Sequence, residues 1–254
     1  MRQARGAGSP ERAEVFQVLY NITGFQPEWE SAMGRMVQLT ASDGHTFGAY
    51  RAEPAGKPKG GLIVVMEIFG VNSHIRKVTD EYAADGYLAI APAMFDRVQR
   101  DLDVGYTQQD IEIARPLMQK MNFADAIKDV EAAMQNIASA RKISIVGFCW
   151  GGSVAWKSAC NVRGLTCAIP YYGGAIPGMI AEQPKCPVLC HWGETDQSIP
   201  LEKAKQVAAA HKDQTHYFYP AGHGFNCSER GSYHAESAGL ARTRTLDFLA
   251  RHAG

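Results

Sequence analysis

From Met36 onward, short apolar runs alternate with longer amphipathic stretches. The short runs have the length of buried strands. In the longer stretches apolar residues recur every three or four positions, which is typical of helices. Strands that alternate with helices predict a mainly parallel sheet with helices on both faces. We expect strands at residues 36–39, 47–51, 62–66, 88–91, 143–146, 166–169, 188–191 and 215–219.

Six amphipathic stretches are expected to be helices. Asp43-Gly44, between the first two strands, is typical of a hairpin turn, so these strands are expected to pair antiparallel at one edge of the sheet. Residues 33–254 are therefore expected to form a single α/β domain. The expected helices cover residues 73–85, 110–120, 123–140, 152–161, 201–212 and 233–251.

Residues 1–32 are expected to be a poorly ordered N-terminal extension of this domain. The segment opens rich in Arg, Gly and Ala. An Arg-rich opening is found in targeting presequences, but Glu11 and Glu14 follow it closely. The other interpretation is an over-long start, with Met33 or Met36 as the natural beginning.

The composition narrows the class of partner. Of the 254 residues 46% are hydrophobic and 20% charged, and 26 basic residues balance 26 acidic ones. The chain has no stripe of Lys and Arg with interleaved aromatic residues, so neither nucleic acid nor a membrane surface is an expected partner. Its apolar runs are far shorter than the roughly 20 residues that a membrane helix needs. A small molecule is the expected partner.

The cysteines indicate the compartment. Six cysteines are scattered along the chain without a C-x-x-C pair or a His/Cys cluster. This pattern favours reduced thiols in the cytoplasm over disulfides or a zinc site. We therefore expect a soluble cytoplasmic protein.

The strand at 143–146 runs directly into GFCWGG (147–152), which an apolar helix of small residues follows. This is the nucleophile-elbow pattern with Cys in place of Ser. Glycines two positions before and after Cys149 let the strand turn abruptly into the helix, which presents the side chain at a helix N-terminus. That position favours a thiolate. Cys149 is thus the candidate nucleophile, and the alternative is a buried thiol that packs as a small hydrophobe.

A cysteine nucleophile needs a base and a group that orients the base. In enzymes with a nucleophile elbow these follow the nucleophile in the order acid, then His. Asp196 follows the strand at 188–191 in a turn that leads to Pro200, and His223 follows the next strand. Both therefore lie in the expected order at the ends of strands. The alternatives are Glu194 as the acid and a surface-loop position for His223.

Glu67 directly follows the third expected strand, where the loop supplies part of the oxyanion hole in such enzymes. An unpaired carboxylate is costly to bury there. Glu67 is therefore either a solvated loop residue or a second partner of Cys149 and His223. The backbone N–H groups of Ile68 and Trp150 are the expected oxyanion donors.

From about residue 36 to the C-terminus, the chain resembles the dienelactone hydrolase (carboxymethylenebutenolidase) family. The resemblance implies an α/β-hydrolase fold without metal or organic cofactor. It also implies a role in the degradation of aromatic compounds: a dienelactone from chlorocatechol breakdown is opened to maleylacetate through an acyl-enzyme on the cysteine. The motifs that carry it are DGHTFGA (43–49), EIFGVN (67–72), GFCWGG (147–152), AGH (221–223) and RTLDFL (244–249).

The resemblance also implies how the candidate residues work together. In the resting state Glu67 would interact with the protonated Cys149. Substrate binding would then move Glu67, so that Cys149 ionises against His223. Asp196 would orient His223.

Substrate choice in the family depends on cations that hold the dienelactone carboxylate. Arg97, five residues after Pro92, matches one of them, and its planar fork suits a carboxylate; its other interpretation is an exposed charge. The chain departs from the family pattern four residues after His223, where it has Cys227 in place of a second Arg. Arg230 lies nearby in sequence. This departure keeps a related lactone or another small ester open as the substrate.

Phe69 and Tyr172, with Trp150, are expected as pocket walls, because a flat conjugated lactone packs well on aromatic faces. A function of another class also remains open, in which the fold is a non-catalytic thiol or ligand sensor and oxidants react with Cys149. The substrate is expected to be a small lactone or ester with a carboxylate. The protein is expected to be a monomer or a small homo-oligomer.

Overall fold

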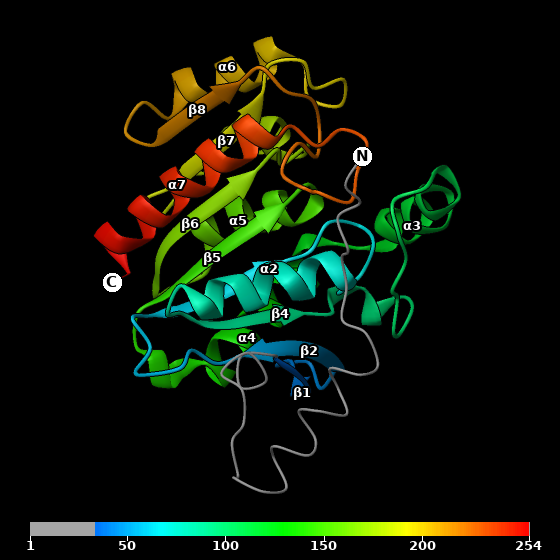
Figure 1. The fold of residues 1–254 in the computed structure, drawn as a ribbon, viewed down its shortest axis with the longest axis vertical. Helices are drawn as coiled ribbons and strands as arrows, with labels where there is room; N and C mark the ends of the chain where they lie inside the picture. The colour runs from blue at the N-terminus through cyan, green and yellow to red at the C-terminus, as the bar shows by residue number, and fades with distance from the viewer. Residues whose placement is uncertain (1–33, 254) are drawn as a thin grey trace, which may run out of the picture.

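The computed structural model describes residues 34–253, whose strands form one sheet (Figure 1). The spatial order is β1-β2-β4-β3-β5-β6-β7-β8. β2 pairs antiparallel with β1 and β4, whereas the other neighbours are parallel. The mainly parallel sheet with an edge hairpin is therefore confirmed. The strands are β1 (Arg35–Thr40), β2 (Thr46–Ala52), β3 (Gly61–Val65), β4 (Leu88–Pro92), β5 (Ile143–Phe148), β6 (Leu165–Tyr171), β7 (Leu189–Gly193) and β8 (Thr215–Tyr219).

Helices cover both faces of the sheet. In Figure 1, α2 and α7 lie over one face and α4, α5 and α6 over the other. The helix α3 stands apart, beyond the carboxyl ends of the parallel strands (Figure 1). The helices are α2 (Ser73–Ala84), α3 (Gln108–Lys120), α4 (Phe123–Asn136), α5 (Trp150–Asn161), α6 (Leu201–Ala210) and α7 (Ala235–His252).

Some boundaries differ from the predicted ones for local reasons. The helix predicted from residue 152 begins at Trp150, because Cys149 itself is the N-cap residue. The helix predicted over 123–140 ends at Asn136 and continues as a 3₁₀ turn, after which Arg141 has a positive φ of 66°. The short 3₁₀ helices Met94–Arg97 and Ile176–Met179 were not predicted. The predicted N-terminal extension lies outside the described residues.

The central strands are buried on both sides. Every residue of β3 and of β5 is buried, as expected for parallel strands between two helical layers. By contrast, four of the five residues of the edge strand β8 are only half-buried. In the described part of the chain, no helix is both long and apolar enough to span a membrane.

The functional edge of this sheet is the one where the parallel strands end. Glu67 follows β3, Cys149 follows β5, Asp196 follows β7 and His223 follows β8. In open α/β sheets, ligands bind outside the carboxyl ends of the strands. The topology thus brings four residues that are far apart in the sequence to one edge.

Candidate active site

The turn between β5 and α5 holds Cys149 in a strained backbone conformation, with φ 56° and ψ −116°. A non-glycine residue in this region is uncommon and marks a tightly constrained turn. The flanking glycines are required sterically. A Cβ at Gly147 would collide with the carbonyl oxygen of Gly151, and a Cβ at Gly151 would collide with the carbonyl oxygens of Val65 and Met66. The predicted elbow is therefore present.

The side chains of Cys149, His223 and Asp196 form a continuous chain of contacts. His223 Nε2 lies 3.1 Å from Cys149 Sγ, and His223 Nδ1 lies 2.8 Å from Asp196 Oδ2. The other carboxylate oxygen of Asp196 accepts hydrogen bonds from the backbone N–H groups of Ser198 and Ile199, at 2.7 and 3.0 Å. These two bonds fix the carboxylate, and the carboxylate in turn fixes the imidazole ring.

Electrostatics favour a charged His223. Burial alone lowers the pKa of His223, but the interactions with Cys149 and Asp196 outweigh burial and raise the pKa to about 10. An imidazole with this pKa is protonated at neutral pH, where it can pair with a thiolate. The geometry therefore places a protonated imidazole in contact with the sulfur of Cys149.

Glu67, which follows β3 at the same edge of the sheet, is 1% exposed. Its Oε1 atom is 2.9 Å from Nη1 of Arg230, whereas its Oε2 atom is buried without a hydrogen-bond partner in the described structure. Burial works against the charge of Arg230, but Glu67 outweighs burial and raises the pKa of Arg230. Glu67 is thus paired with Arg230 while Cys149 is paired with His223, which differs from the expected resting contact between Glu67 and Cys149.

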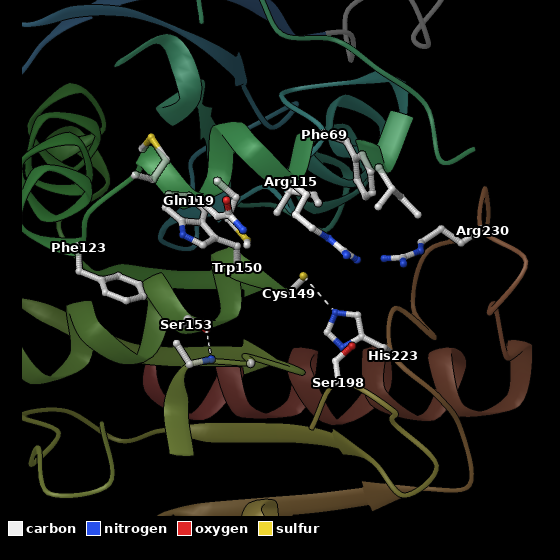
Figure 2. Close-up of a pocket in the computed structure, with 16 residues that line it drawn as sticks. Phe69, Arg115, Gln119, Phe123, Cys149, Trp150, Ser153, Ser198, His223 and Arg230 are labelled. Carbon is white, nitrogen blue, oxygen red and sulfur yellow. Dashed lines mark hydrogen bonds between the residues drawn. The ribbon is translucent and has the colours of Figure 1, made fainter. Parts of the chain in front are cut away.

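A cavity of about 540 Å³ opens onto the sulfur. Figure 2 shows the guanidinium groups of Arg115 and Arg230 pointing toward each other beside Cys149 and His223. Phe123 lies on the opposite side of Cys149 (Figure 2). The cavity lining is formed by Ile68, Phe69, Ile111, Arg115, Met118, Gln119, Met121, Phe123, Cys149, Trp150, Ser153, Gly174, Ala175, Ser198, His223 and Arg230.

The predicted walls and oxyanion donors occupy different positions around this cavity. Ile68, Phe69 and Trp150 line it, as expected. Tyr172 instead is 1% exposed and packs against His223, with 5.1 Å between the ring centroids. Tyr172 therefore supports the imidazole from the protein interior and does not form part of the cavity surface.

The structure does not bring Arg97 into this cavity. Its guanidinium binds Asp129 on α4 at 2.7 Å and Asp43 in the β1–β2 turn at 3.1 Å. The Asp129 side chain is fully buried, so Arg97 neutralises a carboxylate that has no access to water. The position of Arg97 thus differs from the one expected for a substrate cation.

The cavity contains a cation that the sequence analysis missed. Arg115 lies on α3 and has no ion-pair or hydrogen-bond partner among the described residues. Ile111, Arg115 and Met118 lie at intervals of four and three residues, which places them on one face of the helix. That spacing was present in the sequence, but nothing there showed which face the nucleophile would meet.

Two further observations concern other chemistry. All six cysteines are free thiols. Between residues 34 and 253, no group of three or more His, Cys, Asp or Glu side chains is placed to hold a metal ion.

The parallel sheet, the nucleophile elbow and the residues at the strand ends together define an α/β hydrolase. The chain belongs to the dienelactone hydrolase family, whose model matches residues 47–253. The predicted fold and family are therefore confirmed, and the protein is a hydrolase.

Individual relatives agree with this assignment. The chain is 30% identical over 225 residues to a carboxymethylenebutenolidase of Pseudomonas putida, an alignment that covers 84% of this chain and 95% of the relative. It is 35% identical over 232 residues to a Yersinia pestis protein provisionally named carboxymethylenebutenolidase, with 83% and 86% covered. A crystal structure of a provisionally named dienelactone hydrolase from Klebsiella pneumoniae has a TM-score of 0.74 and 29% identity, with 86% and 100% covered.

Proposed function

We propose that this protein hydrolyses a small lactone or carboxylic ester through a thioester on Cys149. The observation that carries the proposal is the chain of contacts from Cys149 Sγ through His223 to Asp196, which opens into the cavity at the carboxyl edge of the sheet. A nucleophile, a base and a group that orients the base are the parts that acyl transfer requires.

In the first half of the reaction, the Cys149 thiolate attacks the carbonyl carbon and a carbon–sulfur bond forms. The backbone N–H groups of Ile68 and Trp150 stabilise the oxyanion. Trp150 is the first residue of α5, where N–H groups have no partner within the helix. The carbon–oxygen bond of the ester then breaks, and the leaving oxygen takes a proton from His223 Nε2.

In the second half, His223 removes a proton from water, and the hydroxide attacks the thioester. The carbon–sulfur bond breaks, which releases the carboxylic acid and restores the thiolate and imidazolium pair. Asp196 keeps Nε2 of His223 directed at the sulfur in both halves. Glu67 holds Arg230, whose side chain lines the same cavity as Cys149.

The substrate carries a carboxylate that Arg115 and Arg230 bind. Arg115 is an uncompensated cation among the described residues, and the Arg230 guanidinium faces it across the cavity (Figure 2). Arginine is suited to a carboxylate because its fork makes two parallel hydrogen bonds. A carboxylated dienelactone, opened to maleylacetate in chlorocatechol degradation, is the substrate that the family resemblance implies.

The proposal is tested by the rate of lactone opening in variants of two thiols, one at the elbow and one near the C-terminal end of the helix that follows it. Cys149→Ala abolishes turnover of a carboxylated dienelactone. Cys160→Ala, which changes a buried thiol on α5 outside the cavity, retains turnover. Retained turnover in folded Cys149→Ala would contradict the proposal.

A further inference from the structure

We propose that the preferred substrate also carries an apolar alkyl or aryl group, which occupies the half of the cavity opposite the arginines. This half, here named the apolar arm, is formed by Met118, Met121, Phe123 and Trp150. The inference rests on the proposed function and specifies its substrate class. It predicts a substrate that is larger than a one-ring lactone acid.

The two halves of the cavity differ in chemistry. Figure 2 shows Cys149 between them, with Arg115, Arg230 and His223 on one side and Trp150 and Phe123 on the other. A carboxylate held by the arginines therefore leaves the apolar arm empty unless the substrate has a second, apolar part. Water in such an arm would find few hydrogen-bond partners.

The polar groups near the arm are few. Ser153 lines the cavity; its hydroxyl oxygen accepts the N–H of Ala175 at 3.0 Å, and its O–H remains a donor. Gln119 is the remaining uncharged polar side chain among the described residues of this half, and it lies beside Trp150 (Figure 2). The arm can thus accept a mainly apolar group with few polar substituents.

The volume supports a second substrate part. The cavity volume of about 540 Å³ lies within the range of about 300–1,000 Å³ that is typical of ligand pockets. Cavities of this size take drug-sized ligands. A compact lactone with one small ring fills only part of it, and the unfilled part is the arm.

The walls of the arm include an aromatic ring held by packing, Trp150, and two adaptable side chains, Met118 and Met121. Trp150 is held by an edge-to-face contact with Phe95, with 5.1 Å between the ring centroids. Met118 and Met121 are unbranched and polarizable, so they adjust to groups of different shape. We therefore infer tolerance toward the shape of the apolar group and a clear gain from its size.

One helix sets the distance between the two ends of the substrate. Arg115 and Met118 both lie on α3, three residues apart, which corresponds to a rise of about 4.5 Å along the helix axis. Side chains of one helix therefore contact both the carboxylate and the apolar group. Because Cys149 lies between Arg115 and Trp150 in the cavity, the best substrates have the two groups on opposite sides of the scissile carbonyl (Figure 2).

The test uses dienelactone acids with a ring alkyl substituent that grows from hydrogen to hexyl. Burial of each methylene is expected to raise kcat/KM by roughly threefold to fourfold. The same acids, after ring opening, bind to Cys149→Ala, and calorimetry should give a Kd that falls by a similar factor for each methylene. The second measurement does not depend on catalysis.

A matched pair of variants locates the effect. Met118→Glu places a charge in the arm, so kcat/KM should hardly rise with each added methylene. Ile113→Glu places the same charge on the same helix, at a side chain that is 42% exposed and does not line the cavity, and should retain the full gain.

The outcomes separate this inference from the proposed function. Acylation of Cys149 by the unsubstituted lactone, with no gain from longer chains in kcat/KM or Kd, would overturn the inference alone. Equal loss of the gain in Met118→Glu and Ile113→Glu would also overturn it. If no member of the series acylates Cys149, the proposed function fails, and the inference fails with it.

Discussion

Arg230 Nη1 lies 2.9 Å from Oε1 of Glu67, and this ion pair joins a buried carboxylate to a cation that lines the cavity. The Arg230 side chain is 18% exposed and the Glu67 side chain 1% exposed. Each charge therefore depends on the other for compensation. The pair also fixes Arg230 in the cavity, within 5.7 Å of the Phe69 ring centroid.

Replacement of one member of this pair should destabilise the protein strongly. Arg230→Met leaves the Glu67 carboxylate buried without a counterion, which costs about 3–5 kcal/mol in the free energy of unfolding. The double variant Glu67→Gln/Arg230→Met removes both charges and should recover most of this loss. Urea unfolding of the three proteins measures both values, and equal loss in the single and double variants would argue against a coupled pair.

Arg97 should matter for stability and not for substrate choice. Arg97→Ala leaves the fully buried Asp129 carboxylate uncompensated, so we expect a loss of about 3–5 kcal/mol in the free energy of unfolding. The ratio of kcat/KM for a carboxylated lactone to that for its uncharged methyl ester should stay at the wild-type value. A fall in this ratio would contradict the prediction and indicate that Arg97 binds the substrate carboxylate.

Arg115 should show the opposite behaviour. It makes no ion pair or hydrogen bond within the described part of the chain, so Arg115→Ala should leave the free energy of unfolding nearly unchanged. The same ratio of kcat/KM should fall by about 10-fold to 100-fold, because hydrogen bonds to charged groups contribute about 1.5–3 kcal/mol. Steady-state kinetics on the two lactones give the ratio, and Arg97→Ala is the matched control.

His191 should make the protein less stable in mild acid. The ring is fully buried between the Tyr219 hydroxyl at 2.8 Å and the Thr245 hydroxyl at 3.0 Å. Burial, with a smaller effect of Arg244, lowers the pKa of His191 to about 3. As the pH falls below 6.5, the unfolded chain takes up a proton that the folded protein cannot accept. The free energy of unfolding should therefore decrease between pH 6.5 and about 3.

The magnitude of this acid effect can be isolated by substitution. The contribution of His191 corresponds to a loss of about 2 kcal/mol between neutral pH and pH ~5. Urea unfolding of the wild type and of His191→Gln at several pH values gives the free energy of unfolding as a function of pH. The contribution of His191 is the difference between the slopes of the two plots of free energy against pH. Parallel slopes would show that His191 does not titrate in this way.

The elbow and the residues at the strand ends could be predicted from the sequence because local rules govern them. Gly147 and Gly151 are required sterically, because a Cβ at either position would collide with backbone atoms in this abrupt turn from strand to helix. The parallel sheet brings the ends of its strands together at one edge. The alternation of apolar and amphipathic stretches was sufficient for the sheet. The eighth strand, Thr215–Tyr219, was predicted with the bounds that the structure has.

The cations of the site could not be assigned in the same way. Arg97 has its partners at Asp43 and Asp129, which are distant in sequence, so no local pattern reveals that its charge is already neutralised. Arg115 lies on a helix whose orientation over the sheet edge depends on the fold. Side chains that act through long-range contacts therefore require the structure, whereas those fixed by a turn do not.

The central claim is a thioester on Cys149, and rapid-quench mass spectrometry tests it most directly. The wild type is mixed with an excess of carboxylated dienelactone, quenched in acid within milliseconds and digested. The account predicts an added acyl mass on the peptide that contains Cys149, which forms and decays at rates compatible with turnover and is absent from Cys149→Ala. Steady turnover with an unmodified Cys149 peptide at every quench time would contradict it.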